Sequence, residues 1–238
     1  MNVLVTGGSR GIGRAIALRF ARDGAARVAI GYLRNDTAAE ETAAELRAVG
    51  ADVTLVRGNV GSDRVLQEVA ALGALDVLVH NAATGVVRPA LETEDKHWDW
   101  TMNANARALL ALARAAAPNM PAGASVVAIS SLGSRRVLDN YTLIGTSKAA
   151  LEALVRYLAV ELAPDIRVNA VSAGVVETGA LEHFPNRDEM LRVGAANPAG
   201  RLVTPDDVAG AVAFLCSPDA AMVRGHVLVV DGGFSLPV

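Results

Sequence analysis

The chain has almost no cysteine, no strong charge of either sign and no long apolar run, and each absence excludes a class of protein. Cys216 is its only cysteine, so a disulfide framework is excluded and the reducing cytoplasm is the expected compartment. A net charge of -3 gives no electrostatic basis for binding nucleic acid or an anionic membrane surface. The longest apolar runs, such as Val126–Ile129, are too short to span a bilayer, and Met1 leads directly into a strand pattern without a signal peptide. We therefore expect a soluble globular protein.

Metal-ligand spacing is also absent. The four histidines lie far apart in the sequence, and none is paired at i, i+4 with another type of ligand: they are His80, His97, His183 and His226. We therefore expect no metal site, and we interpret Cys216 as a small buried apolar residue on a late helix.

Short β-rich runs alternate with longer alanine-rich helical runs along all 238 residues. The predicted strands are Asn2–Thr6, Arg27–Gly31, Asp52–Arg57, Asp76–His80, Ser125–Ser130, Arg167–Ser172 and His226–Val230. The predicted helices are Gly11–Asp23, Thr37–Val49, Ser62–Leu72, Lys96–Ala117, Ser147–Leu162 and Pro205–Cys216. The strands are apolar on both sides, which indicates an α/β fold with a single Rossmann-type doubly wound parallel sheet of about seven strands and helices on both faces. No linker, charge block or repeat divides the chain, so residues 1–238 are predicted to form one domain.

The segment from Glu177 to Arg201 interrupts this alternation. Glycines and prolines punctuate short apolar clusters such as Ala180-Leu181 and Met190-Leu191. Because the segment follows the carboxyl end of a strand, where open α/β sheets bind ligands, we interpret residues 177–201 as a substrate lid of one or two short helices. An ordinary surface excursion is the alternative.

A glycine-rich turn follows the first predicted strand, with the sequence Thr6-Gly7-Gly8-Ser9-Arg10-Gly11-Ile12-Gly13. Gly7, Gly11 and Gly13 allow a tight turn, a close approach of the backbone to a pyrophosphate, and close packing of the next helix, whose N-terminus attracts phosphate. A glycine triplet alone is a weak signal, but at a strand–turn–helix junction it predicts a dinucleotide site.

The residues around the second strand indicate which dinucleotide is bound. An enzyme specific for NAD usually has an acidic residue at the end of this strand, which binds the ribose 2′-hydroxyl. Here the strand end, residues 30–35, contains no carboxylate, and the first one is Asp36. Arg10 and Arg34 are instead placed to neutralise a 2′-phosphate. Each arginine alone is more often a solvated surface charge, but the two together favour NADPH/NADP+.

The stretch Tyr141-Thr142-Leu143-Ile144-Gly145-Thr146-Ser147-Lys148 carries the candidate catalytic pair. Together with the glycine turn, Asn81-Ala82-Ala83 and Ser130-Ser131, it resembles the short-chain dehydrogenase/reductase superfamily, whose usual pair is Tyr-x-x-x-Lys. Four residues before Lys148 stands Ile144, which cannot transfer a proton, and Tyr141 stands seven residues before it. The Tyr-x6-Lys spacing of Tyr141 and Lys148 resembles that of the enoyl-thioester reductases of the superfamily.

The resemblance also implies roles for further residues. Lys148 matches the lysine that binds the nicotinamide ribose and lowers the pKa of the tyrosine, because an ammonium stabilises phenolate. Ser131 matches the serine that orients the substrate, and Asn103 matches the helix asparagine that supports the lysine through water. His80 replaces the usual asparagine after the fourth strand, and we interpret it as a packed residue. The implied cofactor residues are Gly7, Ser9, Arg10, Gly11, Ile12, Gly13, Arg34, Asn59, Val60, Asn81, Ala82, Lys148 and Thr178.

The displaced tyrosine bears on which bond is reduced. Seven residues of helix would place Tyr141 on the face of Lys148, roughly 10 Å along the axis. Gly145 and its β-branched neighbours make a continuous helix doubtful there, and a bent start would shorten that distance. Reduction of a ketone puts hydride on the carbon bonded to the oxygen that takes the proton, whereas reduction of an enoyl thioester puts hydride on C3 and collects charge on the thioester oxygen. A tyrosine moved outward from a fixed lysine meets the second demand; the alternative is that Tyr141 is a loop residue and no tyrosine acts.

Longer segments resemble the NADPH-dependent enoyl-[acyl-carrier-protein] reductase III family of bacterial fatty-acid synthesis. The resemblance covers essentially the whole chain and is closest in residues 81–89, 97–103, 130–134, 149–154, 183–187 and 230–233. It implies reduction of the C2=C3 double bond of trans-2-enoyl thioesters on acyl carrier protein or coenzyme A, with Tyr141 stabilising and protonating the enolate oxygen. Because carrier proteins are acidic, four arginines are candidates for docking them: Arg88, Arg135, Arg136 and Arg187. Burial of Trp98, Trp100 and the apolar face of Ser147–Leu162 between subunits predicts a homotetramer, with a homodimer as the alternative.

Three functions are consistent with the sequence. The first is an enoyl-thioester reductase, in fatty-acid synthesis or in a specialised polyketide pathway. The second is a carbonyl reductase acting on a β-keto thioester or polyketide, because a shared scaffold does not fix the chemistry. The third is a non-catalytic NADP-binding regulator, but a sensor needs only the cofactor site, so retention of Lys148, Ser131 and Asn103 argues against it. The spacing of Tyr141 favours the first function over the second.

Overall fold

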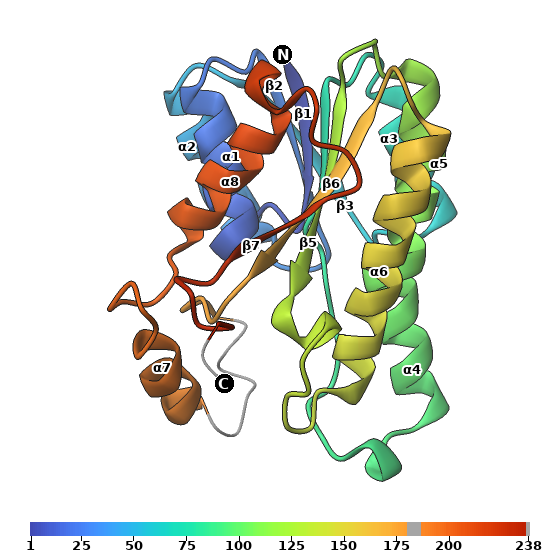
Figure 1. Ribbon diagram of the computed structural model, residues 1–238. Helices are drawn as coiled ribbons and strands as arrows, with labels where there is room; N and C mark the ends of the chain where they lie inside the picture. Colours follow the sequence, from blue (N-terminus) through green and yellow to red (C-terminus); the bar gives the residue numbers. More distant parts are fainter. Residues whose placement is uncertain (180–186, 237–238) are drawn as a thin grey trace.

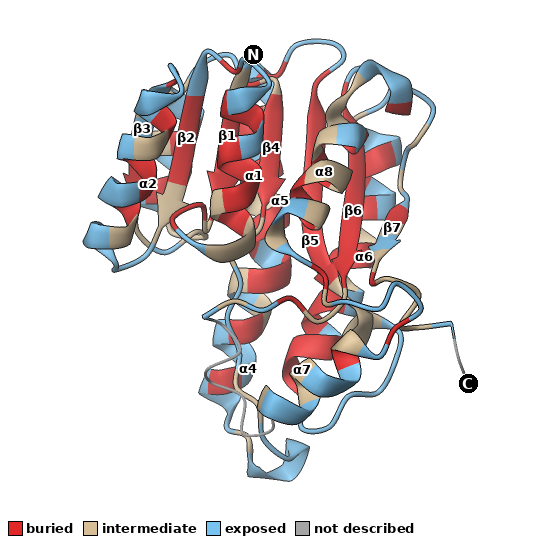
Figure 2. Cartoon of the chain, turned by 90° about the vertical axis from the view of Figure 1, so that its left-hand side faces the viewer, coloured by how far each residue is buried: buried red, intermediate tan, exposed pale blue. Residues whose placement is uncertain are grey.

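Seven strands form one parallel sheet in the computed structural model, which describes residues 1–179 and 187–236. Their order across the sheet is β3-β2-β1-β4-β5-β6-β7, and each neighbouring pair is parallel. The strands are β1 (Asn2–Thr6), β2 (Arg27–Tyr32), β3 (Asp52–Arg57), β4 (Val77–His80), β5 (Ser125–Ser131), β6 (Arg167–Ala173) and β7 (Val227–Val230). Most residues of the central strands are buried, as a parallel sheet covered on both faces requires (Figure 2).

Helices cover both faces of the sheet (Figure 1). They are α1 (Gly11–Arg22), α2 (Asp36–Ala48), α3 (Asp63–Ala71), α4 (Asp95–Met102), α5 (Ala108–Ala116), α6 (Thr142–Glu161), α7 (Arg187–Ala195) and α8 (Pro205–Cys216). Helices α1, α2 and α8 lie on one face, and α3, α5 and α6 lie on the other. None of these helices, within the residues that the structure describes, combines the length and the apolar character needed to span a bilayer.

Alternate residues of each strand contribute to two separate cores. Val3 and Val5 of β1 pack in a cluster that includes Ile16 of α1, whereas Leu4 packs in the opposite cluster with Leu112 of α5. Side chains of a strand point alternately to the two faces of a sheet, so an apolar residue at every position fills both cores. The double-sided apolar pattern of the sequence therefore corresponds to the observed three-layer arrangement.

The predicted alternation and sheet are confirmed, and two helices differ from their predicted bounds by more than one residue at an end. The helix predicted over 96–117 is interrupted by a π-helical segment, Asn103–Arg107, between α4 and α5. Helix α6 begins at Thr142, whereas the sequence predicts a start at Ser147 and a doubtful helix before it. Gly145 does not end this helix. A Cβ at this position would lie 2.6 Å from the carbonyl oxygen of Gly133, so the glycine allows the turn after β5 to pack directly on α6.

Strand β1 marks the point at which the strand order reverses. Strand β2 lies on one side of β1 and β4 on the other, so the connections that follow β1 and β4 diverge. In open α/β sheets a crevice forms outside the carboxyl ends of the strands at this point, and ligands bind there. The functional site is therefore expected at the edge where β1, β4, β5 and β6 end.

The segment predicted as a lid leaves the sheet after β6 and contains helix α7. A parallel bridge between Val176 and Val203 holds the two ends of the excursion side by side. The apolar pair Ala180-Leu181 and the segment 183–186 lie outside the described residues. Met190-Leu191 lies within α7, so one short helix is observed in the described part of this segment.

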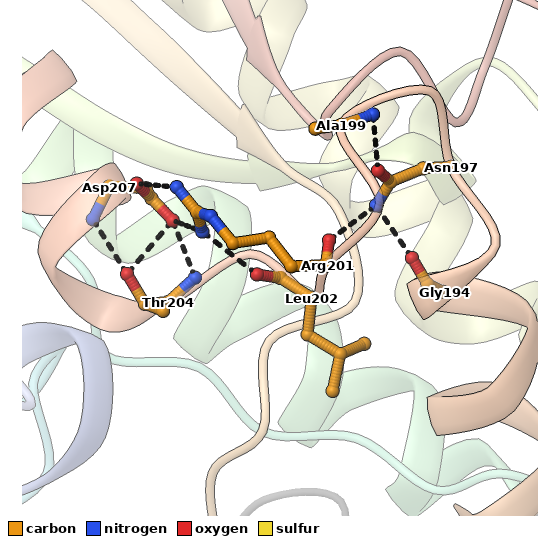
Figure 3. A network of polar contacts seen from close by, with 7 residues as sticks. All are labelled: Gly194, Asn197, Ala199, Arg201, Leu202, Thr204 and Asp207. Carbon is orange, nitrogen blue, oxygen red and sulfur yellow. Dashed lines mark hydrogen bonds and ion pairs between the residues drawn. The ribbon is translucent and has the colours of Figure 1, made fainter.

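The return from α7 to α8 is fixed by a polar network (Figure 3). The side chain of Asn197 donates to the carbonyl oxygens of Gly194 and Arg201, both at 2.7 Å. The guanidinium of Arg201 donates to both carboxylate oxygens of Asp207, at 2.6 and 2.8 Å, and Asp207 also caps α8 together with Thr204. These contacts hold the pKa of Asp207 well below its usual range, because Arg201 and Thr204 stabilise the ionised form. These contacts therefore connect the C-terminal side of the excursion to the start of α8.

Candidate active site

A cleft of about 1420 Å³ opens at the carboxyl edge of the sheet. It is lined by the predicted site residues Gly7, Ser9, Arg10, Gly11, Ile12, Arg34, Asn59, Val60, Asn81, Ala82, Ser131, Tyr141, Lys148 and Thr178. Of the predicted residues, Gly13 and Asn103 do not line it. The fold thus brings together residues from the ends of six strands, β1 to β6, and their individual roles stay predictions.

The glycine turn after β1 has the geometry of a phosphate cradle. Gly7 and Gly11 have positive φ angles of 65° and 54°, which side-chain-bearing residues rarely adopt. A Cβ on Gly13 would overlap the carbonyl oxygen of Gly7, so this glycine allows α1 to pack against the turn. The amide of Asn81 donates to the carbonyl oxygens of Thr6 and Gly7, at 3.1 and 3.0 Å. Asn81 therefore fixes the shape of the turn, and the residues present fit a dinucleotide pyrophosphate at the N-terminus of α1.

The opposite end of the glycine turn is covered by Thr178. Its methyl carbon lies 3.3 Å from the position of a Cβ on Gly11. The segment after β6 therefore reaches across to the turn after β1, as the predicted cofactor contact requires. Asn59 lines the same cleft but uses its side-chain oxygen to accept from the backbone N–H of Gly61, at 3.2 Å.

The charges at the end of β2 are arranged as the sequence predicts. Arg10 and Arg34 are exposed at the cleft, and neither pairs with a carboxylate among residues 1–179 and 187–236. Asp36, the first acidic residue after β2, is already engaged by the Tyr32 hydroxyl at 2.9 Å and by the Arg57 guanidinium at 3.4 Å. The two free cations therefore favour an anionic substituent at this end of the cleft.

Lys148 is buried on α6, and its ammonium donates to the carbonyl oxygen of Ile129 at 2.7 Å. Burial lowers the pKa of Lys148 to about 8, and the charge of Glu152 opposes that shift. Two residues further along β5, the Tyr141 hydroxyl lies 3.4 Å from Ser131 Oγ. Two strand residues span roughly 7 Å. The Lys148 ammonium and the Tyr141 phenol therefore contact two nearby residues, Ile129 and Ser131, at the end of β5.

Tyr141 occupies a slot formed by two glycines. Its ring carbons lie 2.6 Å from the position of a Cβ on Gly133 and 3.7 Å from that of a Cβ on Gly145. The residue immediately precedes α6, and its carbonyl oxygen accepts from the N–H of Gly145 at 2.7 Å. The sequence implies that Lys148 lowers the pKa of Tyr141. Instead burial raises the pKa of Tyr141 and the Ser131 hydrogen bond opposes the rise, while the ammonium points to the strand.

The asparagine beside the lysine helix is Asn105, so the position predicted for Asn103 is wrong. Asn103 is exposed, faces a separate small pocket and accepts a long hydrogen bond from Arg107 at 3.4 Å. Asn105 is fully buried, and its amide donates to Ser147 Oγ, next to Lys148, at 2.9 Å. The two asparagines lie about 200° apart around a helix, so one at most can face α6.

His80 is a packed residue, as predicted, and it connects the end of β1 with the π-helical segment Asn103–Arg107. It is 1% exposed, and its ring nitrogens contact Thr6 Oγ1 at 3.3 Å and the carbonyl oxygen of Asn105 at 3.1 Å. Burial, together with the nearby charge of Lys148, lowers the pKa of His80 to about 4. The ring is therefore neutral near pH 7, with one nitrogen donating and the other accepting.

Beside Asp139 and Glu189, apolar side chains line much of the rest of the cleft. They come from α4, the turn after β5, α7 and the C-terminal segment, and they are Trp100, Leu132, Val137, Leu138, Met190, Val193 and Phe234. This lining suits an uncharged organic group bound next to the Tyr141 hydroxyl.

Comparisons with known proteins agree over nearly the whole chain. The family described as Enoyl-(Acyl carrier protein) reductase matches residues 7–235. The 1-cyclohexenylcarbonyl-CoA reductase of Streptomyces collinus is 38% identical over 98% of this chain and 86% of its own length. The crystal structure of BdcA in complex with NADPH has a TM-score of 0.87 and 35% identity, covering 98% of this chain and 93% of that one. The promiscuous reductase LugOII, which catalyses keto-reduction at C1 during lugdunomycin biosynthesis, has a TM-score of 0.89 and 33% identity, covering 99% and 98%.

Proposed function

The chain is an oxidoreductase of the short-chain dehydrogenase/reductase family, and on that premise we propose that it uses NADPH to reduce the C2=C3 double bond of trans-2-enoyl thioesters. The observation that carries the proposal is the position of Tyr141. Its hydroxyl contacts Ser131 at the end of β5, while Lys148 is held two residues earlier on the same strand. This arrangement supports a proton donor set outward from the lysine, where the oxygen of a conjugated thioester would require it.

In this proposal some residues of the site bind the cofactor and others bind the substrate. When bound, NADPH supplies the hydride that the double bond accepts at C3. Lys148 holds the nicotinamide ribose, and Tyr141 and Ser131 hold the thioester oxygen, on which negative charge collects during the reaction. Because burial raises the pKa of Tyr141, its phenol stays protonated at neutral pH and can donate its proton to that oxygen.

The choice of NADPH rests on Arg10 and Arg34. We expect Arg10→Ala and Arg34→Ala each to lower kcat/KM for NADPH by about 10- to 100-fold, because each removes a charge-assisted bond to the 2′-phosphate. The value for NADH should change by less than about twofold, since NADH lacks that phosphate. Steady-state kinetics with both cofactors measures this difference, with Arg22→Ala at the exposed end of α1 as the matched control. Equal use of NADH and NADPH by the unchanged protein would refute the assignment.

We propose coenzyme A or acyl carrier protein as the thioester carrier. The CoA reductase relative supports the first, and the family description supports the second. Of the four arginines predicted to dock an acidic carrier, three are less available than expected, and Arg88 is exposed. Arg135 pairs with Glu152 at 3.1 Å, Arg187 with Glu177 at 3.1 Å, and Arg136 donates to the Ser235 carbonyl at 2.9 Å.

Residues 177–201 serve in this proposal as a lid over the acyl group. Support comes from Met190 and Val193 of α7, which line the cleft, and from the Val176–Val203 bridge at the base of the excursion. Slower proteolysis within this segment when NADPH and a thioester are added is the expected result. Unchanged proteolysis would contradict it.

We propose a homotetramer, or a homodimer, as the assembly. Exposed apolar side chains on α4 and α6 support it: Trp98, Tyr157 and Val160, whereas the exposed Trp100 lines the cleft. Light scattering that reports a single species of monomer mass would overturn this part of the proposal.

A ketoreductase is the second candidate, and the likeness to LugOII favours it. In that case the same cleft would bind a β-keto thioester or a polyketide carbonyl. The two candidates differ in the bond reduced, so a comparison of substrates separates them.

The test of the proposed function compares crotonyl-CoA with acetoacetyl-CoA at equal concentration, following the loss of NADPH absorbance. We expect kcat/KM for the crotonyl ester to exceed that for the acetoacetyl ester by at least about tenfold, with butyryl-CoA as the product. Turnover of the acetoacetyl ester alone would assign a ketoreductase. Turnover of neither would remove thioesters from the proposal.

A further inference from the structure

Glu152 is a buried carboxylate at the active site that has no part in the chemistry proposed above. It lies one helical turn after Lys148 on α6, and its side chain is 5% exposed. Ser130 Oγ and Ser134 Oγ both donate to Oε1, at 2.7 and 2.6 Å, and Arg135 Nε donates to Oε2 at 3.1 Å. Burying a carboxylate costs desolvation free energy, which hydrogen-bond donors must offset. The three donors that surround the Glu152 carboxylate therefore indicate that it has a specific role.

The three donors of Glu152 surround the predicted substrate-orienting residue Ser131. Ser130 precedes it on β5, and Ser134 belongs to the short turn that follows. Ser131 Oγ accepts in turn from the N–H of Gly133 at 3.3 Å and from the Tyr141 hydroxyl at 3.4 Å. Helix α6 therefore contacts the same strand end twice: Glu152 binds Ser130 before Ser131 and Ser134 after it, and Lys148 binds the carbonyl oxygen of Ile129, two residues before Ser131.

The charge of Glu152 also acts on Lys148. The titratable groups that interact with the ammonium through its charge are His80 from β4 and Glu152 from α6. Arg135 from the turn pairs with Glu152, and Tyr141, which precedes α6, contacts Ser131. His80 is neutral near pH 7 and Tyr141 is a neutral phenol. Glu152 is thus the negative charge that opposes the effect of burial on Lys148 within the described residues.

We propose that Glu152 is a positioning residue of the reductase site, which clamps the Ser130–Arg135 turn to α6 and supports the ammonium form of Lys148. It touches neither substrate nor cofactor in this proposal. Its first effect is to fix Ser131 Oγ against the Tyr141 hydroxyl, and its second is to hold a positive charge next to the cofactor ribose. The inference rests on the proposed function, because it assigns a task at the residues that perform the reaction.

The chain offers a direct measurement of the second effect, because Lys96 and Lys148 are its only lysines. In a Lys96→Arg background grown with lysine ¹³C-labelled at Cε, the single NMR signal reports the titration of Lys148 without substrate or cofactor. We expect Glu152→Gln to move that titration to lower pH by on the order of one pH unit, since a nearby negative charge is lost. Glu161→Gln, an exposed change of the same kind at the end of α6, should leave it unmoved.

Steady-state kinetics distinguish the two proposed effects of Glu152, the positioning of the Ser130–Arg135 turn and the effect of its charge on Lys148. Glu152→Asp keeps the charge but is too short to reach both serines, so Lys148 should titrate as in the parent while kcat falls by about tenfold or more. Glu152→Gln should lower kcat and also move the alkaline limb of the pH–rate profile to lower pH, with KM for NADPH changed by less than about twofold. A Glu152→Gln protein whose Lys148 titration and kcat both match the parent would overturn the proposal.

The titration keeps this proposal separate from the proposed function. If the unchanged protein reduces neither thioester, the proposed function fails, but the Lys148 titration still tests the effect of Glu152. Circular dichroism identifies a variant that does not fold. In that case Ser134→Ala removes one donor at the edge of the cluster and leaves the carboxylate in place. It is expected to lower kcat by about threefold, and an unchanged kcat would count against the clamp.

Discussion

Replacement of Tyr141 by phenylalanine is expected to lower kcat for crotonyl-CoA by about 100- to 1000-fold, because the hydroxyl that stabilises the developing oxyanion is removed. The ring should keep its place, since it is held between Gly133 and Gly145 and only the oxygen beside Ser131 is lost. The affinity for NADPH should therefore change by less than about twofold. Single-turnover reduction and fluorescence titration of NADPH measure the two quantities separately.

Tyr157 supplies the matched control for this prediction. It lies on the same helix, but its side chain is 69% exposed, and it does not line the cleft. Tyr157→Phe should keep the activity of the parent. Retention of most activity in Tyr141→Phe would mean that no tyrosine acts as the proton donor, and the proposed chemistry would then lose its main support.

The sheet and most of the site could be predicted because they depend on local patterns. An apolar strand followed by a glycine turn and an amphipathic helix has few other ways to fold, and the carboxyl ends of parallel strands necessarily meet at one edge. Gly7, Asn81, Ser131 and Lys148 therefore lie in one cleft as expected. What the pattern could not supply is contact between residues distant in sequence.

The start of α6 illustrates such a contact. Gly145 lowers the intrinsic preference for helix, so the residues before Ser147 are poorly suited to one by propensity. The structure places a continuous helix there because the missing Cβ lets the backbone of Gly133 approach α6, and that packing outweighs propensity. The residues between Tyr141 and Lys148 therefore form continuous helix, and Tyr141 itself is the N-cap residue of α6, with φ -105° and ψ 11°.

Two further residues were missed for different reasons. Asn105 carries a readable signal, because Thr101, Asn105 and Leu109 fall on one buried stripe at helical spacing, and Asn103 does not. Glu152 carries almost none. Its partners Ser130 and Ser134 lie 22 and 18 residues away, and a glutamate in an amphipathic helix usually faces solvent. Arg135, a candidate docking residue from the sequence, also belongs to this cluster.

Replacement of Lys148 by methionine is expected to make the protein more stable at neutral pH while removing most of its activity. Burial lowers the pKa of Lys148 from 10.5 to about 8, so the folded protein holds the ammonium at a cost of about 3 kcal/mol relative to the unfolded chain. Methionine fills a similar volume without charge and leaves the carbonyl of Ile129 unpaired, which costs about 1 kcal/mol. The net gain of about 2 kcal/mol at pH 7 should raise Tm by several degrees.

The pH dependence of stability tests this account with its sign fixed in advance. Below about pH 8 both states of the parent hold the proton on Lys148, and the full cost of burial is present. Between about pH 8 and 10.5 the folded state releases its proton first, so the parent gains stability as pH rises and the advantage of Lys148→Met shrinks. Urea denaturation at pH 7 and pH 10 measures this difference. Lys96→Met, at an exposed position on α4, should show no such trend.

The same substitution should lower kcat/KM for crotonyl-CoA by at least about 100-fold, because the ammonium is expected to bind the cofactor ribose. A variant that is both less stable than the parent at pH 7 and inactive would mean that Lys148 is held in a structural ion pair. A variant that is more stable and inactive would mean that the fold tolerates a costly buried charge because the reaction needs it. The second outcome is expected, since the direct hydrogen-bond partner of the ammonium is a neutral carbonyl and the nearest opposing carboxylate is occupied by Ser130, Ser134 and Arg135.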